Sequence, residues 1–345
     1  MKFLFAGLAA CLMAQAAVMP ASAADLRKDA LAVFKPIPAT IPVIKDDPVT
    51  PAKVDLGRML FFDPRLSGGQ VLSCNSCHDV GAGGSDAGPT STGHNWQKGP
   101  RRSPTVFNAV FNIAQFWDGR AKDLKAQASG PMENPVEMAS TADKVMAVLR
   151  SMPGYITAFK KAFPQDKDPV TFDNTTRAIE AFEATLITPN SRFDQFLKGN
   201  DSAMNAEEKA GLRLFMDKGC SACHNGINIG GNAYYPFGVV TKPGPKILPR
   251  NDHGRSVVTK TASDDYVFRV APLRNVALRA PYFHSGQVWT LQEAVEVMAN
   301  AQLGTQLTPD EVKKVTAFLG TLTGEQPRIV YPILPVRTAD TPIPE

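Results

Sequence analysis

The residues of this chain best suited to redox or metal chemistry are concentrated in two short segments. The chain has five cysteines and five histidines, and the pattern Cys-x-x-Cys-His occurs twice, at residues 74–78 and 220–224. Two thiols at this spacing can add to the vinyl groups of a porphyrin, and the histidine that follows can bind its iron. The pattern predicts two covalent haem c groups. The predicted attachment and iron-binding residues are Cys74, Cys77 and His78 for the first haem, and Cys220, Cys223 and His224 for the second.

Two other kinds of site use a Cys-x-x-Cys pair. A redox dithiol uses the cysteines for disulfide exchange, and a zinc site uses them as half of a four-ligand set. A zinc ion shared by the two segments would need ligands that lie far apart in the sequence. Neither alternative explains why a histidine follows each pair, so the haem interpretation is favoured.

The amino terminus predicts that the protein is exported. Residues 1–23 contain Lys2, a mostly apolar run over residues 3–19 and small residues at 21–23, a pattern typical of a secretory signal peptide. Cleavage there removes Cys11, so every remaining cysteine belongs to a haem segment. No later segment approaches the roughly 18 apolar residues of a membrane span, which in a bacterium predicts a periplasmic protein without one. A formal net charge of +4 without a lysine or arginine run gives no indication of nucleic-acid binding.

The segments ahead of the two haem motifs are similar, "GRMLFFD" at 57–63 and "GLRLFMD" at 211–217. This repeat predicts a mainly α fold, with two cytochrome c-like haem domains joined at an interface and with long ordered loops. The expected boundaries are residues 24–187 for the N-terminal domain and 188–325 for the C-terminal domain, with the connection between residues 185 and 201. A longer segment between the repeat and the motif in the first copy predicts that the two pocket rims differ.

Hydrophobic periodicity predicts the helices, several of which begin after a capping residue such as Thr171, Asn205 or Thr308. The predicted helices are Ala121–Ala128, Ala142–Ala162, Asp173–Ile187, Ala206–Met216, Leu291–Ala301 and Pro309–Leu322. Strand patterns are few and short. Glycine and proline are too dense over residues 36–51 and 226–249 for long elements, so ordered loops are expected there.

Each iron needs a second axial ligand. His94 lies in a glycine-rich segment that could swing over the first haem, and it is interpreted as a displaceable ligand, the alternative being a surface histidine. For the second iron a methionine would raise the potential, and Met298 lies on the apolar stripe of a predicted helix. Methionine on such a stripe is usually core, so periodicity leaves this ligand open among the methionines. His284 is placed near the second haem or a propionate, and His253 at the surface.

The run from His94 through "FWDGRAKDLKAQASGPMENPVEMAS" at 116–140, the two haem motifs and "APYFHSG" at 280–286 together resemble the bacterial dihaem cytochrome c peroxidases. The resemblance spans nearly the whole mature chain. It implies a low-potential peroxidatic haem in the N-terminal domain, with His78 proximal and His94 a distal ligand that leaves on activation. It also implies a high-potential electron-transfer haem in the C-terminal domain, bound axially by His224 and Met298.

The same resemblance implies that Gln127 and Glu137 line the peroxide pocket and that Trp117 lies between the haems. From the residues alone, Glu137 could equally be a solvated carboxylate at a helix start, and Trp117 could be a core residue. The expected activity is reduction of hydrogen peroxide to water, with electrons from a small periplasmic cytochrome c or copper protein. A homodimer is expected, and the tail over residues 326–345 is expected to pack back on the first domain.

The resemblance further implies a calcium ion near the domain interface. Relatives often place an Asn side chain on this ion where the present chain has Arg102, whose cation cannot coordinate calcium. The backbone carbonyls of Arg279 and Pro281 are the remaining candidate calcium ligands.

Two other functions compete with the peroxidase. One is a non-catalytic dihaem electron carrier in which His94 stays bound. The other is a dihaem oxidase that modifies a partner protein, whose relatives replace the methionine ligand by tyrosine and leave the first haem open. The presence of both His94 and Met298 favours the peroxidase.

Overall fold

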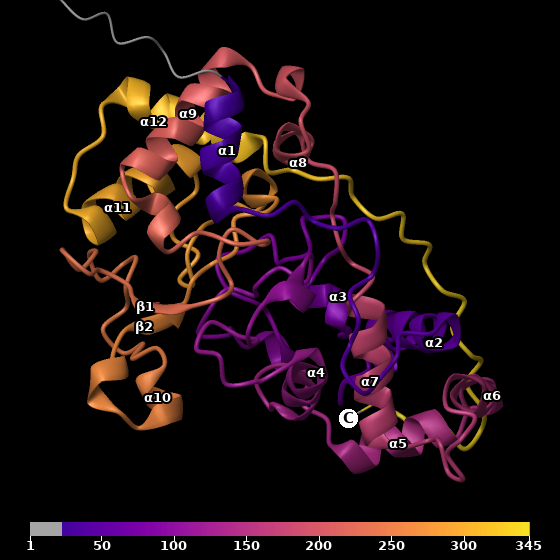
Figure 1. Cartoon of the computed structure of the whole chain (residues 1–345). Coiled ribbons are helices and arrows are strands. Elements are labelled where there is room, and N and C mark those ends of the chain that lie inside the picture. Colours follow the sequence, from indigo (N-terminus) through magenta and orange to yellow (C-terminus); the bar gives the residue numbers. More distant parts are fainter. Residues whose placement is uncertain (1–22, 345) are drawn as a thin grey trace, which may run out of the picture.

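The computed structural model describes residues 23–344, and it is mainly helical, with two groups of helices side by side (Figure 1). The signal peptide predicted over residues 1–23 lies outside this range except for Ala23, the first residue of helix α1 (Ala23–Val33). Within residues 23–344 no helix combines the length and apolarity needed to cross a bilayer.

The first helical group surrounds a core in which α2 (Pro51–Phe62) crosses α7 (Phe172–Glu183) at very short range. A Cβ at Gly57 would lie 1.8 Å from the carbonyl oxygen of Ala178, so only glycine allows this approach. One turn further on, the rings of Phe61 and Phe182 meet edge to face with centroids 5.2 Å apart. The remaining helices of this group are α4 (Leu124–Glu133), α5 (Ala142–Arg150) and α6 (Pro153–Ala162).

The second helical group repeats this crossing with α9 (Ala206–Asp217) on α12 (Pro309–Gly320). A Cβ at Gly211 would lie 1.9 Å from the carbonyl oxygen of Lys314, and the rings of Phe215 and Phe318 are 5.3 Å apart. The repeat seen in the sequence is therefore a repeated helix crossing, which confirms the fold of two cytochrome c-like domains. Helices α8 (Arg192–Leu197) and α11 (Leu291–Leu303) complete this group.

Helix α1 was not among the predicted helices, and it packs on the second core. Leu26 and Ala30 are its buried residues, and the ring of Phe34, the residue after the helix, lies 5.4 Å from that of Phe193. The expected boundaries placed these residues in the N-terminal domain. An apolar stripe at helical spacing indicates that one face of the helix is buried, but it does not indicate which core it packs against.

The predicted helix over residues 142–162 is wrong in one respect, because the structure divides it into α5 and α6. Met152 is extended, with φ −111° and ψ 109°, as expected for a residue that precedes a proline, and Pro153 begins α6. The helix predicted from Ala121 begins only at Leu124, where the Asp123 side chain accepts from the Ala126 amide, and it continues to Glu133. The remaining predicted helices exist, with ends shifted by up to four residues: α7, α9, α11 and α12.

The predicted caps are confirmed, because Thr171, Asn205 and Thr308 each accept a hydrogen bond from a backbone amide three residues later. The strands in the described part of the chain are short, as predicted. Strand β1 (Tyr234–Pro236) pairs antiparallel with β2 (Val267–Arg269), next to the short helix α10 (Ser256–Thr259).

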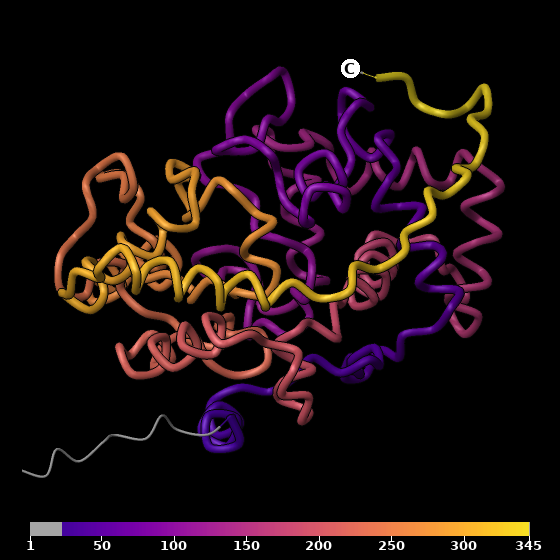
Figure 2. Tube along the Cα trace, turned by 90° about the horizontal axis from the view of Figure 1, so that it is seen from above, coloured from indigo at the N-terminus to yellow at the C-terminus, as the bar shows by residue number. Residues whose placement is uncertain are grey.

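The C-terminal tail runs from the second helical group along the surface of the first (Figure 2). The Arg65 guanidinium donates to the Pro335 carbonyl at 2.7 Å, and the Gln70 amide donates to the Pro342 carbonyl at 2.9 Å. The ring of Tyr331 lies 4.7 Å from that of Phe62. The tail thus ties the two groups together.

Candidate functional site

The first haem motif lies on the short helix α3 (Cys74–Cys77), which places its two cysteines one turn apart. Ser73 and Ser76 form a capping box at its start, and His78 ends it. The His78 Nδ1 lies 2.9 Å from the carbonyl oxygen of Pro104. Because a carbonyl can only accept, Nδ1 carries the proton and Nε2 keeps the lone pair that binds a metal. Burial lowers the pKa of His78, which favours this neutral form.

A cavity of about 470 Å³ opens beside this motif. Helix α4 contributes Gln127 to its wall, the segment after α4 contributes Glu137, and α7 contributes Glu183. Predicted residues that the structure brings together around this first pocket are Cys74, Cys77, His78, Trp117, Gln127 and Glu137.

Glu137 has an environment suited to proton transfer. Burial raises the pKa of its carboxyl group, while the Arg120 charge and a hydrogen bond from Asn134 act in the opposite direction. The Asn134 amide donates to Oε1 of Glu137 at 3.0 Å. Arg120 is held by the ring of Phe116, whose centroid lies 3.4 Å from the guanidinium carbon. The carboxyl group is therefore oriented, and a raised pKa makes it easier to protonate.

His94 lies outside the first pocket in this structure. Its ring is beside Gly69, where a Cβ would lie 3.5 Å from two ring atoms, and it does not line the cavity. The His94 amide donates to the Glu137 carbonyl at 2.8 Å. A Cβ at Gly93 would lie 2.0 Å from the Val136 carbonyl oxygen, so the loop passes tightly over the segment that carries Glu137. The predicted ligand role of His94 does not describe this conformation.

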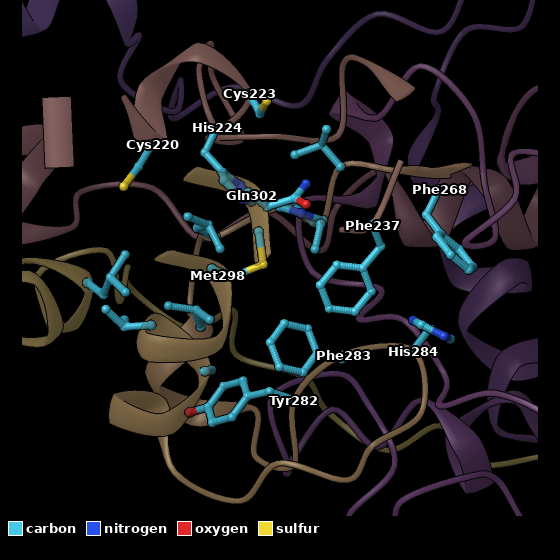
Figure 3. A pocket seen from close by; sticks show the side chains of 18 of the residues that line it. Cys220, Cys223, His224, Phe237, Phe268, Tyr282, Phe283, His284, Met298 and Gln302 are labelled. Carbon is cyan, nitrogen blue, oxygen red and sulfur yellow. The ribbon is translucent and has the colours of Figure 1, made fainter. Parts of the chain in front are cut away.

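The second haem motif lies between α9 and the following loop, beside a cavity of about 220 Å³. Figure 3 shows Met298 and His224 among the side chains that line this pocket. Burial lowers the pKa of His224 to about 4, so its imidazole is neutral, and Nδ1 lies 3.4 Å from the Ile229 carbonyl oxygen. Aromatic side chains occupy much of the opposite wall, including Phe237 and Phe283, whose rings are 5.1 Å apart. The predicted residues gathered here are Cys220, Cys223, His224 and Met298.

Trp117 lies between the two pockets and lines both of them. Its indole Nε1 donates to the Arg102 carbonyl at 2.8 Å, and its own carbonyl accepts from the Arg269 amide at 2.7 Å. The next residue, Asp118, is bound by Arg101, which also binds Asp252 of the second half of the chain. The indole is thus fixed in position by groups from both halves.

The two remaining histidines, His284 and His253, lie in different environments, one at the second pocket and one at the surface. His284 lines the second pocket, stacks on Phe268 with ring centroids 4.4 Å apart, and has its Nε2 3.7 Å from Asp252. Burial lowers the pKa of His284 to about 4. His253 is half-exposed and its Nδ1 lies 2.8 Å from Asp265, which confirms its surface position.

These donor sets fit haem c better than either alternative. All four cysteines of the described chain are free thiols. Burial raises the pKa of Cys77 and Cys220 to about 11, which disfavours the thiolate needed for disulfide exchange. Among residues 23–344 no group of three or more His, Cys, Asp or Glu side chains is arranged to hold a metal ion. Two thiols and a neutral imidazole beside each cavity define a c-type cytochrome with two haem sites.

Comparison with known proteins places this dihaem cytochrome in a family. The family described as di-haem cytochrome c peroxidase matches residues 51–202, and the cytochrome c family matches residues 208–323. The chain is 61% identical to the cytochrome c551 peroxidase of Pseudomonas aeruginosa over 326 residues, covering 94% of each protein. It is 51% identical to the cytochrome c551 peroxidase of Nitrosomonas europaea, covering 85% of this chain and 87% of that one.

A solved structure agrees with this assignment. A MauG-like protein associated with microbial copper homeostasis is 28% identical, with a TM-score of 0.75, and the match covers 84% of this chain and 95% of that chain. The chain belongs to the di-haem cytochrome c peroxidase family, and it is an oxidoreductase of that class.

The predicted calcium ligands lie at a position that already holds a cation. The carbonyl oxygens of Arg279 and Ala280 face the guanidinium of Arg102, whose Nη2 lies 3.5 Å from the first and 3.3 Å from the second. Pro281 follows directly and lines the second pocket. A calcium ion needs six to eight oxygen ligands and would lie next to this guanidinium. The residues here do not fit calcium.

Three residues of the first pocket were missed by sequence reasoning. Glu183 was missed because its helix is amphipathic, and carboxylates on such a helix are usually assigned to the solvated face. Arg120 and Asn134 lie inside the segment that carried the family resemblance, but their positions next to Glu137 depend on how the chain turns after α4.

Proposed function

We propose that this chain reduces hydrogen peroxide to two waters in the periplasm, with electrons from a small carrier such as a monohaem cytochrome c or a copper protein. The observation that carries the proposal is the difference between the two pockets. The first contains Glu137 and Gln127 beside its haem motif, while the second contains Met298 and aromatic side chains. A polar pocket can handle protons, and an apolar one protects an electron store.

Cys74 and Cys77 would hold one haem and Cys220 and Cys223 the other, with His78 and His224 as the proximal ligands. When bound, each haem supplies an iron that exchanges single electrons. Every other requirement of the reaction falls on side chains of this chain.

Proton transfer falls to Glu137. The reduction consumes two electrons and two protons, and cleavage of the oxygen–oxygen bond requires that a proton move from one peroxide oxygen to the other. As a carboxylate Glu137 accepts the proton of hydrogen peroxide, and as a carboxylic acid it returns that proton to the oxygen that leaves as water. Burial, which raises the pKa of the Glu137 carboxyl group, favours the first step, in which the carboxylate takes up the proton. The Gln127 amide orients peroxide by a hydrogen bond.

Access to the first iron depends on His94. His94 would hold the first iron in the resting protein and would free it on activation. Its ring lies beside Gly69 and not among the side chains that line the first pocket, which supports a displaceable rather than a permanent ligand. The segment around it is rich in glycine, including Gly83 and Gly84 at positive φ, and this permits a large movement of the loop.

His224 and Met298 would hold the second haem, which would supply the site where electrons are taken up. The donor docks transiently over this domain, and Trp117 lies on the way to the first pocket. The protein acts as a homodimer, as its family resemblance implies.

The test uses the purified dihaem protein. It is poised half-reduced, its EPR spectrum is recorded, one equivalent of peroxide is added, and both haems are followed optically. We expect a low-spin ferric signal that becomes high-spin on half-reduction, followed by rapid oxidation of the second haem. A low-spin signal that persists, with slow or no consumption of peroxide, would instead identify a dihaem electron carrier.

The same preparation separates the peroxidase from an oxidase that modifies a partner protein. The peroxidase turns over with peroxide and a reduced small carrier alone, whereas the oxidase needs its protein substrate. Turnover that requires a further protein would overturn the proposal.

A further inference from the structure

The side chain of Arg102 has an unusual place for a cation. It is 4% exposed, and its guanidinium points at backbone carbonyls rather than at a carboxylate. Nη1 donates to the carbonyl of Gly88 at 2.7 Å, and Nη2 donates to that of Ala280 at 3.3 Å, with that of Arg279 at 3.5 Å. A buried cation surrounded by inward-facing carbonyl oxygens is the arrangement that proteins use for a bound metal ion.

These carbonyls come from two segments that belong to different halves of the chain. The segment over residues 83–89 precedes Arg102, and the segment over 278–286 lies in the second half. They touch directly, since a Cβ at Gly286 would lie 2.1 Å from the Pro89 carbonyl oxygen, and one at Gly83 would lie 3.1 Å from that of Leu278. The guanidinium therefore links the two halves where they meet.

The backbone of Arg102 is connected to the groups between the haem pockets. Its amide donates to the His284 carbonyl at 2.7 Å, and its carbonyl accepts from the Trp117 indole at 2.8 Å. A displacement of Arg102 would move both of these residues, which line the second pocket. Arg102 is thus a positioning residue for the interface.

A metal ion at this place would meet positive charge on both sides. Arg279 also lies here, and burial followed by the charge of Arg102 lowers the pKa of Arg279 to about 10. Its guanidinium donates to the Pro272 carbonyl at 2.6 Å. Among the charged neighbours of Arg102, Asp86 attracts it, but one carboxylate does not offset two guanidinium groups and a divalent ion.

We propose that the guanidinium of Arg102 is a built-in cation that replaces calcium at the domain interface, so that this protein links its two haem domains without a metal. A guanidinium carries its charge at every physiological pH and offers several donors in a fixed plane, so it can hold separate carbonyls as a metal ion does. Arg102 links the two domains at all times, whereas the occupancy of a bound calcium ion would depend on the calcium concentration.

The experiment measures calcium binding to the holoprotein with both haems in place. Calcium chloride is titrated calorimetrically into EDTA-treated, dialysed wild type, Arg102→Asn, and the double variant Arg102→Asn/Arg279→Asn. The same substitution at Arg328, an exposed arginine of the tail, serves as the matched control. Thermal unfolding is recorded with EDTA and with about 10 mM calcium, above the roughly 10⁻⁴ to 10⁻³ M dissociation constants of weak extracellular sites.

We expect no calcium binding by wild type or the Arg328 variant, and an unfolding temperature that EDTA leaves unchanged. Arg102→Asn removes the charge and supplies an amide oxygen. Its unfolding temperature should be lower than that of wild type in EDTA and should rise again when calcium is added. It should bind one equivalent of calcium. Binding should be tighter in the double variant, because the second guanidinium no longer repels the ion.

A second measurement distinguishes this role from ordinary packing. The high-spin signal of the half-reduced protein should not depend on calcium in wild type, and it should become calcium-dependent in Arg102→Asn. One equivalent of calcium bound by wild type, with stability lost in EDTA, would overturn the proposal. So would the absence of calcium binding in both Asn variants. Neither outcome depends on peroxidase turnover, which is tested separately.

Discussion

The two haem pockets are built from the same helix crossing and the same motif, yet they differ in what surrounds the motif. Around His78 lie a carboxyl group, an amide and a loop whose histidine is turned away. Around His224 lie a thioether and stacked aromatic rings, in a cavity half as large, about 220 Å³ against about 470 Å³. The same motif therefore lies in two different surroundings, because the side chains that line the two pockets differ.

The difference arises in the segments outside the repeated core. The first pocket receives Gln127 from α4 and Glu137 from the segment after it, and the second receives Met298 from α11. The repeated glycines at 57 and 211 hold equivalent helices together in both halves. The conserved geometry positions the motif, and the added segments decide its chemistry.

The largest effect is expected from removing the carboxyl group of the first pocket. Glu137→Gln keeps the shape but cannot exchange the proton, and general acid–base catalysis contributes about 10²- to 10⁴-fold. We expect kcat/KM for peroxide to fall by that factor in steady-state assays with a reduced carrier, with haem content unchanged. Glu133→Gln, at the exposed end of α4, is the matched control. A fall below tenfold would remove Glu137 from the mechanism.

The second pocket is tested by Met298→His. A nitrogen ligand in place of the thioether should lower the potential of the second haem by on the order of 0.1 V, within the roughly 0.8 V that axial ligands cover. For one electron this is about a fiftyfold change in the reduction equilibrium. Potentiometric titration measures it, and the first haem should keep its potential. Met204→Leu, in the core of the same domain, is the control. An unchanged potential would exclude Met298 as a ligand.

Gln127→Ala tests how much the amide of the first pocket contributes to turnover compared with the Glu137 carboxyl group. It removes a neutral hydrogen bond, for which about 0.5 to 1.5 kcal/mol is typical, so kcat/KM should fall by at most about tenfold. Peroxide turnover measures this, and Gln195→Ala on α8 in the second domain should have no effect. A loss as large as that of Glu137→Gln would mean that the amide has a role beyond orientation.

The remaining effect is on stability and concerns the buried Glu183. Burial, followed by the charge of Glu180, raises the pKa of Glu183 from 4.5 to about 8. The folded protein then holds a proton that the unfolded chain releases, so the free energy of unfolding falls as pH rises between these values. By this shift the fall amounts to about 4 kcal/mol between about pH 5 and about pH 9, and we expect most of it to be absent in Glu183→Gln.

Urea unfolding at the two pH values checks this, with Glu133→Gln again as the exposed control. Equal pH dependence in wild type and Glu183→Gln would show that the carboxyl group titrates normally in the holoprotein.

Local patterns were sufficient for much of the fold. The helices from α7 to α12 that carry strong periodicity begin after caps that the sequence displays, such as Thr171 and Asn205. Pro153 was a signal for a helix break, because the residue before a proline avoids the helical region. The break was nevertheless missed, because the hydrophobic periodicity continues on both sides of it. Helix α1 was missed because it begins at the predicted cleavage site, beside residues excluded from the fold.

The sequence by itself determined the two Cys-x-x-Cys-His motifs and most of the helices, because motif spacing and helix periodicity are local properties. Only the tertiary structure decided that Glu183 faces the first pocket, that His94 lies beside Gly69, and that Arg102 meets carbonyls from the second half of the chain. These contacts join residues far apart in sequence. Their energies depend on burial and charge at the meeting point, which no local pattern encodes.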